Sequence, residues 1–154
     1  MKQFAIRTLI LFMRNCALRH CLSMLVRYLE ELIAAEVAAG IPSDRVVVAG
    51  FSQGGAIALM MLRSSMKLGA VVGLSTYLPL RDQEPVSEAN RGTPVLLCHG
   101  DKDQVVAYEF GRSSDAVLRN LGMSTEFNTY QGMGHSACQA ELKDFKEFVI
   151  KHLK

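Results

Sequence analysis

Four short runs with strand-like composition, separated by stretches with helical spacing, constrain the fold of this chain most strongly. The runs are residues 46–50, 70–74, 94–99 and 124–130. The first three are continuously apolar, which is typical of strands buried on both faces of a parallel sheet. Strands that alternate with helices predict an α/β fold, with a mostly parallel sheet flanked by helices. In such a fold, ligands bind at the carboxyl ends of the strands.

The helical stretches are recognised by apolar residues at intervals of three and four and by glycines that follow them. Gly40, Gly69 and Gly122 each mark the end of such a stretch. Residues 75–93 are polar and contain two prolines, so we expect a loop there. The predicted helices cover residues 22–37, about 55–65, about 106–121 and 136–153.

Composition excludes several classes of protein. Of the 154 residues, 49% are hydrophobic and 21% charged, which is a globular composition and argues against disorder. No run of eighteen uncharged apolar residues is present, so an integral membrane span is not expected. The four cysteines form no C-x-x-C pair, which argues against a zinc ribbon or a disulfide framework. A reducing, cytoplasmic location is therefore predicted.

The net charge of +2 comes from the beginning of the chain. Residues 1–29 carry five basic side chains and no acidic one, and without them the chain has 12 basic and 15 acidic residues. The main body therefore lacks the basic surface expected of a nucleic-acid-binding protein. Residues 1–21 resemble a mitochondrial targeting segment in charge but are poor in serine. We therefore favour an extension of the following helix, or an apolar strand that fills a gap, over a targeting segment.

The segment Gly50-Phe51-Ser52-Gln53-Gly54 fits the pattern G-x-S-x-G and lies between a predicted strand and a predicted helix. In that context the glycines permit a tight, strained turn that lifts the serine hydroxyl above the sheet. The backbone N–H of Gln53, at the start of the helix, then faces a developing oxyanion. Ser52 is therefore a candidate nucleophile.

A serine hydroxyl needs a base and an orienting acid, which in this fold follow the serine in the order Asp, His. Asp103 lies in the loop after the third strand, and His135 lies after the fourth. Asp101 competes with Asp103 for the acid role, although we favour a loop-shaping role for it. His99, at a strand end before the acid, is interpreted as a structural hydrogen-bonding residue. No ligand pair has metal-binding spacing, so no metal is expected.

Four motifs together resemble the acyl-protein thioesterases of the phospholipase/carboxylesterase or lysophospholipase-like group: GFSQGGA, LSTYLPL, PVLLCHGDKDQVV and TYQGMGHSAC. The resemblance runs from about residue 22 to the end of the chain. It implies an α/β-hydrolase domain over residues 22–154, without a metal or organic cofactor. It also implies hydrolysis of protein S-acyl cysteines, lysophospholipids or small carboxylic esters through an acyl-serine. Ser52 would be the nucleophile, His135 the base, Asp103 the orienting acid and Gln53 an oxyanion donor.

The chain departs from this family at its beginning, because residues 1–21 match none of the family's early strands. A truncated gene product, an incomplete gene model or a replacement element would each explain this difference. In the family, a backbone N–H in the loop after an early strand is the second hydrogen-bond donor to the oxyanion, and this sequence offers no counterpart. Loss of one such donor typically lowers turnover by about 10²–10³. The alternative function is therefore a catalytically impaired protein that binds lipid or partners, or a non-functional fragment.

The missing strands also leave an open apolar edge beside residues 46–49, which invites self-association. Residues 4–13 contain the apolar run Leu9-Ile10-Leu11-Phe12-Met13. We expect this segment to lie against the open edge, or to cover it as a helix.

Overall fold

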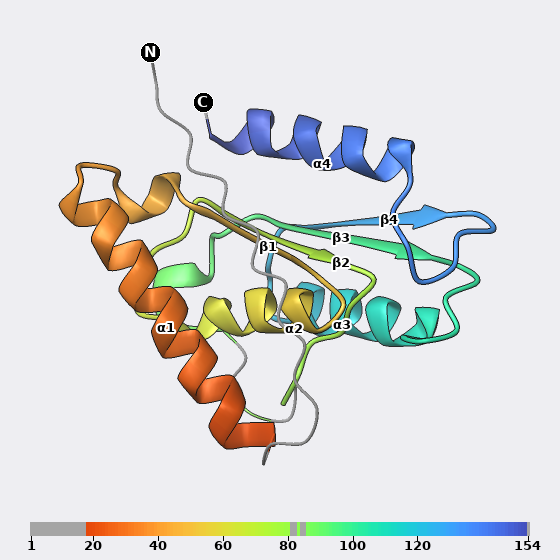
Figure 1. The fold of residues 1–154 in the computed structure, drawn as a ribbon, viewed down its shortest axis with the longest axis horizontal. Helices are drawn as coiled ribbons and strands as arrows, with labels where there is room; N and C mark the ends of the chain where they lie inside the picture. Colours follow the sequence, from red (N-terminus) through yellow and green to blue (C-terminus); the bar gives the residue numbers. More distant parts are fainter. Residues whose placement is uncertain (1–17, 81–82, 84–85, 154) are drawn as a thin grey trace.

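The computed structural model describes residues 18–80, 83 and 86–153. Four strands form one parallel sheet in the order β1-β2-β3-β4 (Figure 1). The strands are β1 (Val47–Phe51), β2 (Ala70–Leu74), β3 (Val95–Gly100) and β4 (Thr125–Tyr130). Each lies within one residue of its predicted bounds, and the predicted α/β fold class is confirmed.

The helix ends depart further from the sequence prediction than the strand ends. The helices are α1 (Leu18–Ala38), α2 (Gln53–Met60), α3 (Tyr108–Asn120) and α4 (Gln139–His152). Helix α1 therefore begins four residues before the predicted start. Helix α4 begins three residues later than predicted, because Cys138 has an extended backbone, with φ −127° and ψ 165°. Short 3₁₀ turns cover Ser43–Arg45, Met61–Arg63 and Glu88–Asn90.

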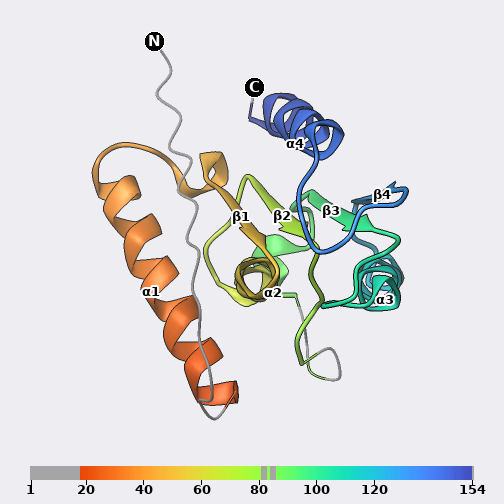
Figure 2. The ribbon, with the colours of Figure 1, turned by 45° about the vertical axis from the view of Figure 1, so that its right-hand side comes forward.

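The helices cover the two faces of the sheet unequally. Figures 1 and 2 show α4 on one face, and α1, α2 and α3 on the other. Because side chains alternate along a strand, Val46 and Val48 join the core on the side of α1, α2 and α3, whereas Val47 joins the core beneath α4. Among the described residues, no helix is long and apolar enough to cross a bilayer.

Each strand is tied to its neighbour at the carboxyl edge of the sheet. The backbone N–H of Ser52, just after β1, donates to the carbonyl of Leu74 at 2.8 Å. The N–H of Ser75, just after β2, donates in the same way to the carbonyl of Cys98 at 2.8 Å. The N–H of Asp101, just after β3, donates to the carbonyl of Tyr130 at 3.2 Å. These bonds bring the segments that leave the strands to one edge, where polar side chains from distant parts of the sequence meet.

Candidate active site

Ser52 occupies a strained turn between β1 and α2. Its backbone has φ 54° and ψ −122°, a conformation that residues other than glycine rarely adopt. A Cβ atom at Gly50 would lie 2.2 Å from the carbonyl carbon of Gly54, so only glycine fits there. The hydroxyl of Thr76 donates to the carbonyl of Ser52 at 2.7 Å. The turn is thus held by the close approach of Gly50 and Gly54 and by the hydrogen bond from Thr76, in the loop after β2.

The side chains of Ser52, His135 and Asp103 form a hydrogen-bonded chain. His135 Nε2 lies 2.9 Å from Ser52 Oγ, and His135 Nδ1 lies 2.8 Å from Asp103 Oδ2. The ring of Phe51 packs against the imidazole with a centroid distance of 4.7 Å. With a proton on Nδ1, the imidazole donates to the carboxylate and accepts from the serine hydroxyl. The structure therefore brings together the three side chains that the sequence analysis selected.

The carboxylate of Asp103 is buried and held on both of its oxygens. Oδ1 accepts hydrogen bonds from the backbone N–H groups of Val105 and Val106, each at 2.9 Å, and Oδ2 faces His135. Burial alone would raise the pKa of Asp103. The hydrogen bonds from His135, Val106 and Val105 outweigh that effect and hold the pKa below its usual value. Asp103 is therefore ionised at neutral pH.

His99 contacts both Asp103 and the segment that follows it. Its Nε2 donates to the carbonyl of Val106 at 2.9 Å and lies 3.4 Å from Asp103 Oδ2. His99 is 1% exposed, and its ring meets the ring of Tyr108 edge-on. His99 thus makes the structural hydrogen bond that the sequence analysis assigned to it. Its contact with Asp103 was not predicted.

Asp101 joins two loops at the same edge. Its Oδ1 accepts a hydrogen bond from the backbone N–H of Gly132 at 2.6 Å. Gly132 belongs to the loop that carries His135, so Asp101 fixes the path of that loop. This contact corresponds to the loop-shaping role expected from the sequence.

Gln53 is the first residue of α2. The first N–H groups of a helix have no acceptor within the helix, and the aligned peptide dipoles give this end a partial positive charge. The N–H of Gln53 follows Ser52 directly and belongs to this positive end of the helix.

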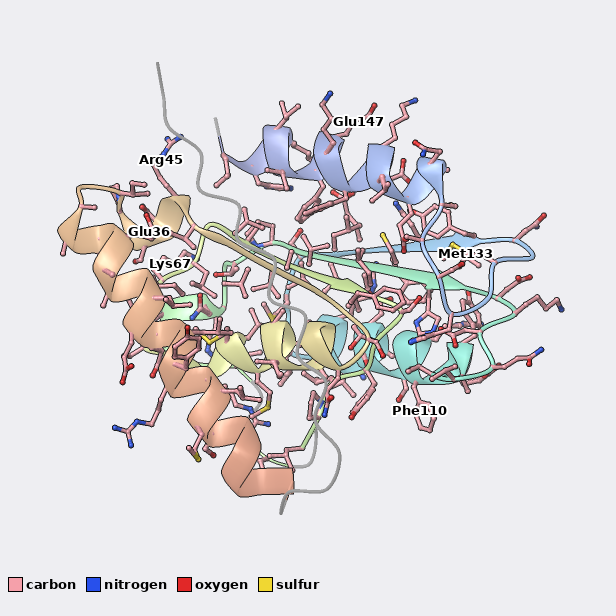
Figure 3. All side chains as sticks on the ribbon, in the orientation of Figure 1. Glu36, Arg45, Lys67, Phe110, Met133 and Glu147 are labelled. Atoms are coloured by element: carbon pink, nitrogen blue, oxygen red, sulfur yellow. The ribbon has the colours of Figure 1, made fainter. Side chains whose placement is uncertain are left out.

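An apolar hollow of about 170 Å³ lies next to these residues. Tyr77, Val105, Val106 and Phe110 line it. Val105 is 71% exposed and Phe110 is 53% exposed, so part of the apolar lining is open to solvent. Figure 3 shows Phe110 projecting away from the sheet at the start of α3. Tyr77, which lines the hollow, follows Thr76, and the hydroxyl of Thr76 donates a hydrogen bond to the carbonyl of Ser52. The backbone N–H groups of Val105 and Val106, which also line it, donate hydrogen bonds to Asp103.

Tyr77 lies in the loop that was expected over residues 75–93, and the other three lining residues were not singled out from the sequence. The available signal was the apolar pair Val105-Val106, which begins two residues after Asp103 in a segment without strand pattern. Among the described residues, no group of three or more His, Cys, Asp or Glu side chains is arranged to hold a metal ion.

Comparisons with known proteins show the family to which this chain is similar. Residues 20–153 match the family described as Phospholipase/Carboxylesterase. Acyl-protein thioesterase 1 of Neurospora crassa is 42% identical over 131 residues, which are 82% of this chain and 54% of that protein. A probable carboxylesterase of Oryza sativa subsp. japonica is 39% identical over 132 residues, which are 84% of this chain and 50% of that protein.

The crystal structure of Arabidopsis thaliana SOBER1 superposes with a TM-score of 0.79 at 32% identity. The match covers 86% of this chain and 65% of the SOBER1 chain. The crystal structure of esterase PE8 superposes with a TM-score of 0.74 at 28% identity and covers 88% of this chain. The chain thus spans little more than half the length of the curated relatives it matches.

Proposed function

Because the chain belongs to the phospholipase/carboxylesterase family and has the α/β-hydrolase fold, we propose that it hydrolyses acyl thioesters and carboxylic esters as a serine hydrolase. The observation that carries this proposal is the hydrogen-bonded chain from Ser52 Oγ through His135 to Asp103, with distances of 2.9 and 2.8 Å. A hydroxyl, an imidazole and a buried carboxylate in this order activate the hydroxyl as a nucleophile.

The reaction proceeds through an acyl-serine in two halves. Ser52 Oγ attacks the carbonyl carbon while His135 Nε2 takes the hydroxyl proton, and the carboxylate of Asp103 stabilises the resulting imidazolium. The N–H of Gln53 donates to the oxyanion of the tetrahedral intermediate. Collapse breaks the bond to the leaving group, which departs as a thiol or alcohol with the proton from His135. Water, deprotonated by His135, then attacks the acyl-serine and releases the carboxylic acid and Ser52.

The substrates we propose are protein S-acyl cysteines, with lysophospholipids and small carboxylic esters as further substrates, in the cytoplasm. Two observations support the choice. The hollow beside the site is lined by Tyr77, Val105, Val106 and Phe110, and an acyl chain that enters it removes apolar surface from water. Relatives such as the one from Neurospora crassa are named acyl-protein thioesterases. Palmitoyl thioesters are therefore the first substrates to assay.

The proposal is tested by labelling purified protein with a fluorophosphonate, which reacts with an activated serine. We expect labelling of the unmodified chain and none of Ser52→Ala or His135→Ala. Ser124→Ala is the matched control, because this exposed serine lies outside the site, and it should label like the unmodified chain. Release of palmitate from a palmitoyl thioester should follow the same pattern. A cooperatively folded chain without labelling would overturn the proposal and favour a non-catalytic, lipid-binding protein.

A further inference from the structure

The peptide group between Ser52 and Gln53 carries a functional atom pair at each end. Its carbonyl belongs to Ser52, and its N–H is the proposed donor to the oxyanion. Because this peptide is planar and trans, the C=O and N–H bonds point in opposite directions and can only turn together. The torsion angle ψ of Ser52, −122°, sets the orientation of that plane. A group that holds the carbonyl of Ser52 therefore also directs the N–H of Gln53.

Two donors hold the carbonyl of Ser52. The backbone N–H of Ala56 donates to it at 3.1 Å, and the hydroxyl of Thr76 donates to it at 2.7 Å. The shorter bond comes from the loop after β2, so it fixes the peptide relative to the sheet and not only relative to α2. A hydrogen bond to a carbonyl also polarises the amide group, which strengthens its N–H as a donor.

The side chain of Thr76 is confined by two elements. Thr76 is 1% exposed. A Cβ at Gly55 of α2 would lie 2.8 Å from Thr76 Cβ, and a Cβ at Gly73 of β2 would lie 2.6 Å from Thr76 Cγ2. These two glycines thus make room for the threonine methyl group. Because a single torsion angle places both the methyl and the hydroxyl of threonine, confinement of the methyl also fixes the hydroxyl.

We propose that Thr76 is a positioning residue whose hydroxyl orients the Ser52–Gln53 peptide, so that the N–H of Gln53 faces the oxyanion during hydrolysis. This inference rests on the proposed hydrolase activity. Thr76 itself touches none of the reacting atoms and acts through the carbonyl of Ser52. Negative charge develops on the substrate oxygen both when Ser52 is acylated and when water attacks the acyl-serine. The orientation of this peptide therefore affects both halves of the reaction.

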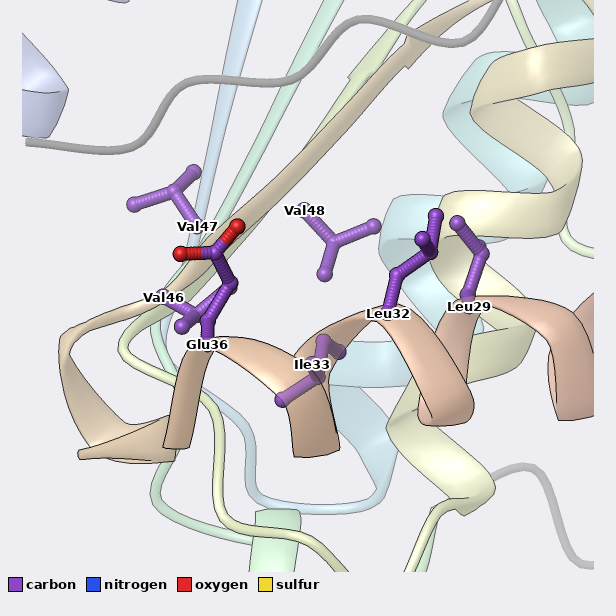
Figure 4. A pocket seen from close by; sticks show the side chains of 7 residues that line it. All are labelled: Leu29, Leu32, Ile33, Glu36, Val46, Val47 and Val48. Carbon is purple, nitrogen blue, oxygen red and sulfur yellow. The ribbon is translucent and has the colours of Figure 1, made fainter. Parts of the chain in front are cut away.

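Strand β1 is also anchored at its other end, away from Ser52. Ile33 of α1 belongs to the same core as Val46 and Val48, and these side chains line one apolar pocket of about 50 Å³ (Figure 4). Residues 4–13, which were expected from the sequence beside this strand, lie outside the described residues. The packing of β1 against α1 does not involve Thr76, so removal of the Thr76 hydroxyl should leave the strand in place.

Thr76→Val is therefore a variant that should fold. Valine has nearly the shape of threonine and keeps the methyl between the two glycines, but it cannot donate a hydrogen bond. The carbonyl of Ser52 keeps the N–H of Ala56 as a donor, so no buried acceptor loses its last partner. Thr76→Ser is the conservative counterpart, because it keeps the hydroxyl and removes the methyl.

The test measures kcat and KM for hydrolysis of p-nitrophenyl acetate, a small carboxylic ester. We expect Thr76→Val to lower kcat at least about tenfold, because a misdirected donor loses part of the roughly 10²–10³ that one donor supplies. KM should change less than about threefold, because the donor acts mainly in the transition states of both halves. Thr76→Ser should keep kcat within about threefold of the unmodified chain.

Thr93→Val is the matched control. Thr93 is 0% exposed, and its hydroxyl donates to Asn90 Oδ1 at 2.8 Å. It lies before β3, at the opposite edge of the sheet from Ser52. Loss of this buried hydroxyl should lower the free energy of unfolding without lowering kcat, which separates an effect on the site from an effect on stability.

A second measurement tests the hydrogen bond without any turnover. The NMR resonance of the Ser52 carbonyl carbon should move upfield in Thr76→Val and stay near its original position in Thr76→Ser, because a carbonyl carbon is deshielded when its oxygen accepts a hydrogen bond. An unchanged resonance in Thr76→Val would overturn the proposal. Equal losses of kcat in Thr76→Val and Thr76→Ser would overturn it as well, since they would assign the effect to packing of the methyl.

The failure of this proposal can be told apart from that of the proposed function. An unmodified chain that neither hydrolyses the ester nor reacts with a fluorophosphonate would overturn the hydrolase activity itself. A chain that hydrolyses the ester equally well with and without the Thr76 hydroxyl would overturn only the positioning role of Thr76.

Discussion

Asp103 shows how a single carboxylate sets the state of a neighbouring ring. Two backbone N–H groups occupy Oδ1, so only Oδ2 remains to receive a proton donor from His135. That arrangement requires a proton on His135 Nδ1 and leaves Nε2 as an acceptor toward Ser52. The positions of the Val105 and Val106 N–H groups thus decide which nitrogen of the imidazole is free to accept a hydrogen bond from Ser52.

Asp103→Asn should therefore strongly reduce the reactivity of Ser52 toward a fluorophosphonate while preserving the fold. The amide oxygen of asparagine would stay with the N–H groups of Val105 and Val106, and its NH₂ group would face His135 Nδ1. The imidazole would then carry its proton on Nε2 and could not accept from Ser52. We expect fluorophosphonate labelling to slow by about 10⁴-fold.

Asp101→Asn is the matched control for that experiment, because the amide oxygen still accepts from Gly132. Its labelling rate should stay within a few-fold of the unmodified chain. Similar losses in both variants would contradict the assigned difference between the two carboxylates.

Gly111 of α3 packs closely against His99, which contacts Asp103. A Cβ at this position would lie 2.4 Å from His99 Nδ1, and His99 is too buried to move away. Gly111→Ala should therefore lower the free energy of unfolding by about 1–3 kcal/mol, measured by urea denaturation. At Gly92, a Cβ would meet only Lys67 Nζ, at 3.7 Å. Equal stability of Gly111→Ala and Gly92→Ala would refute this account.

At the scale of elements, sequence reasoning placed the strands well because their apolar runs are short and bounded by glycine or proline. It also placed Ser52, Asp103 and His135 together, because the carboxyl ends of parallel strands meet at one edge. Their roles remain predictions until tested. Both inferences depend on local patterns read along the chain.

Other features depend on contacts between distant segments, which no local pattern reveals. The side chain of Asn90 accepts from the N–H of Leu68 and donates to the carbonyls of Ser64 and Met66, which organises a loop that looked featureless. The apolar hollow likewise combines Tyr77 with Phe110, more than thirty positions later. The beginning of α4 was placed too early because no glycine or proline separates residues 136–138 from the helix.

Helix α4 carries a buried carboxyl group whose ionisation opposes folding. Glu141 is 0% exposed, and burial raises its pKa from 4.5 to about 7, with a smaller lowering by the backbone of Cys138 and a smaller raising by Asp144. Well below pH 4.5 the carboxyl group of Glu141 is protonated in both the folded and the unfolded chain, so its ionisation does not affect the free energy of unfolding. As pH rises toward about 7, the unfolded chain gains stability by releasing this proton, so the folded state loses up to about 3 kcal/mol.

Glu141→Gln should remove that pH dependence. Relative to the unmodified chain, the variant should gain free energy of unfolding between pH about 4.5 and about 7, measured by denaturant titration at each pH. Glu147→Gln is the control on the same helix, because Glu147 lies on the exposed surface and pairs only loosely with Lys143, at 3.8 Å. A difference between Glu141→Gln and the unmodified chain that stays constant with pH would exclude this role.

At the scale of the whole molecule, one sheet joins two cores. Alternate residues of the same strand contribute to opposite sides, as Leu97 does to the core beside α2 and Leu96 to the core beneath α4. A substitution that destabilises one core therefore also destabilises the strands against which the other core packs. We expect the chain to unfold as one cooperative unit, since neither layer of helices retains a packing surface without the sheet.

Phe148→Ala tests this cooperativity from the side of α4. Phe148 is 3% exposed, belongs to the core beneath α4 and packs against His152 with a ring distance of 4.6 Å. Its truncation should cost about 3–5 kcal/mol, and Phe110→Ala, at a half-exposed position, should cost much less. Far-ultraviolet dichroism reports on all helices, whereas near-ultraviolet dichroism of tyrosine reports on packing around residues such as Tyr130. Coincident transitions by both probes in Phe148→Ala would support a single unit, whereas early loss of part of the helical signal would show that α4 unfolds separately.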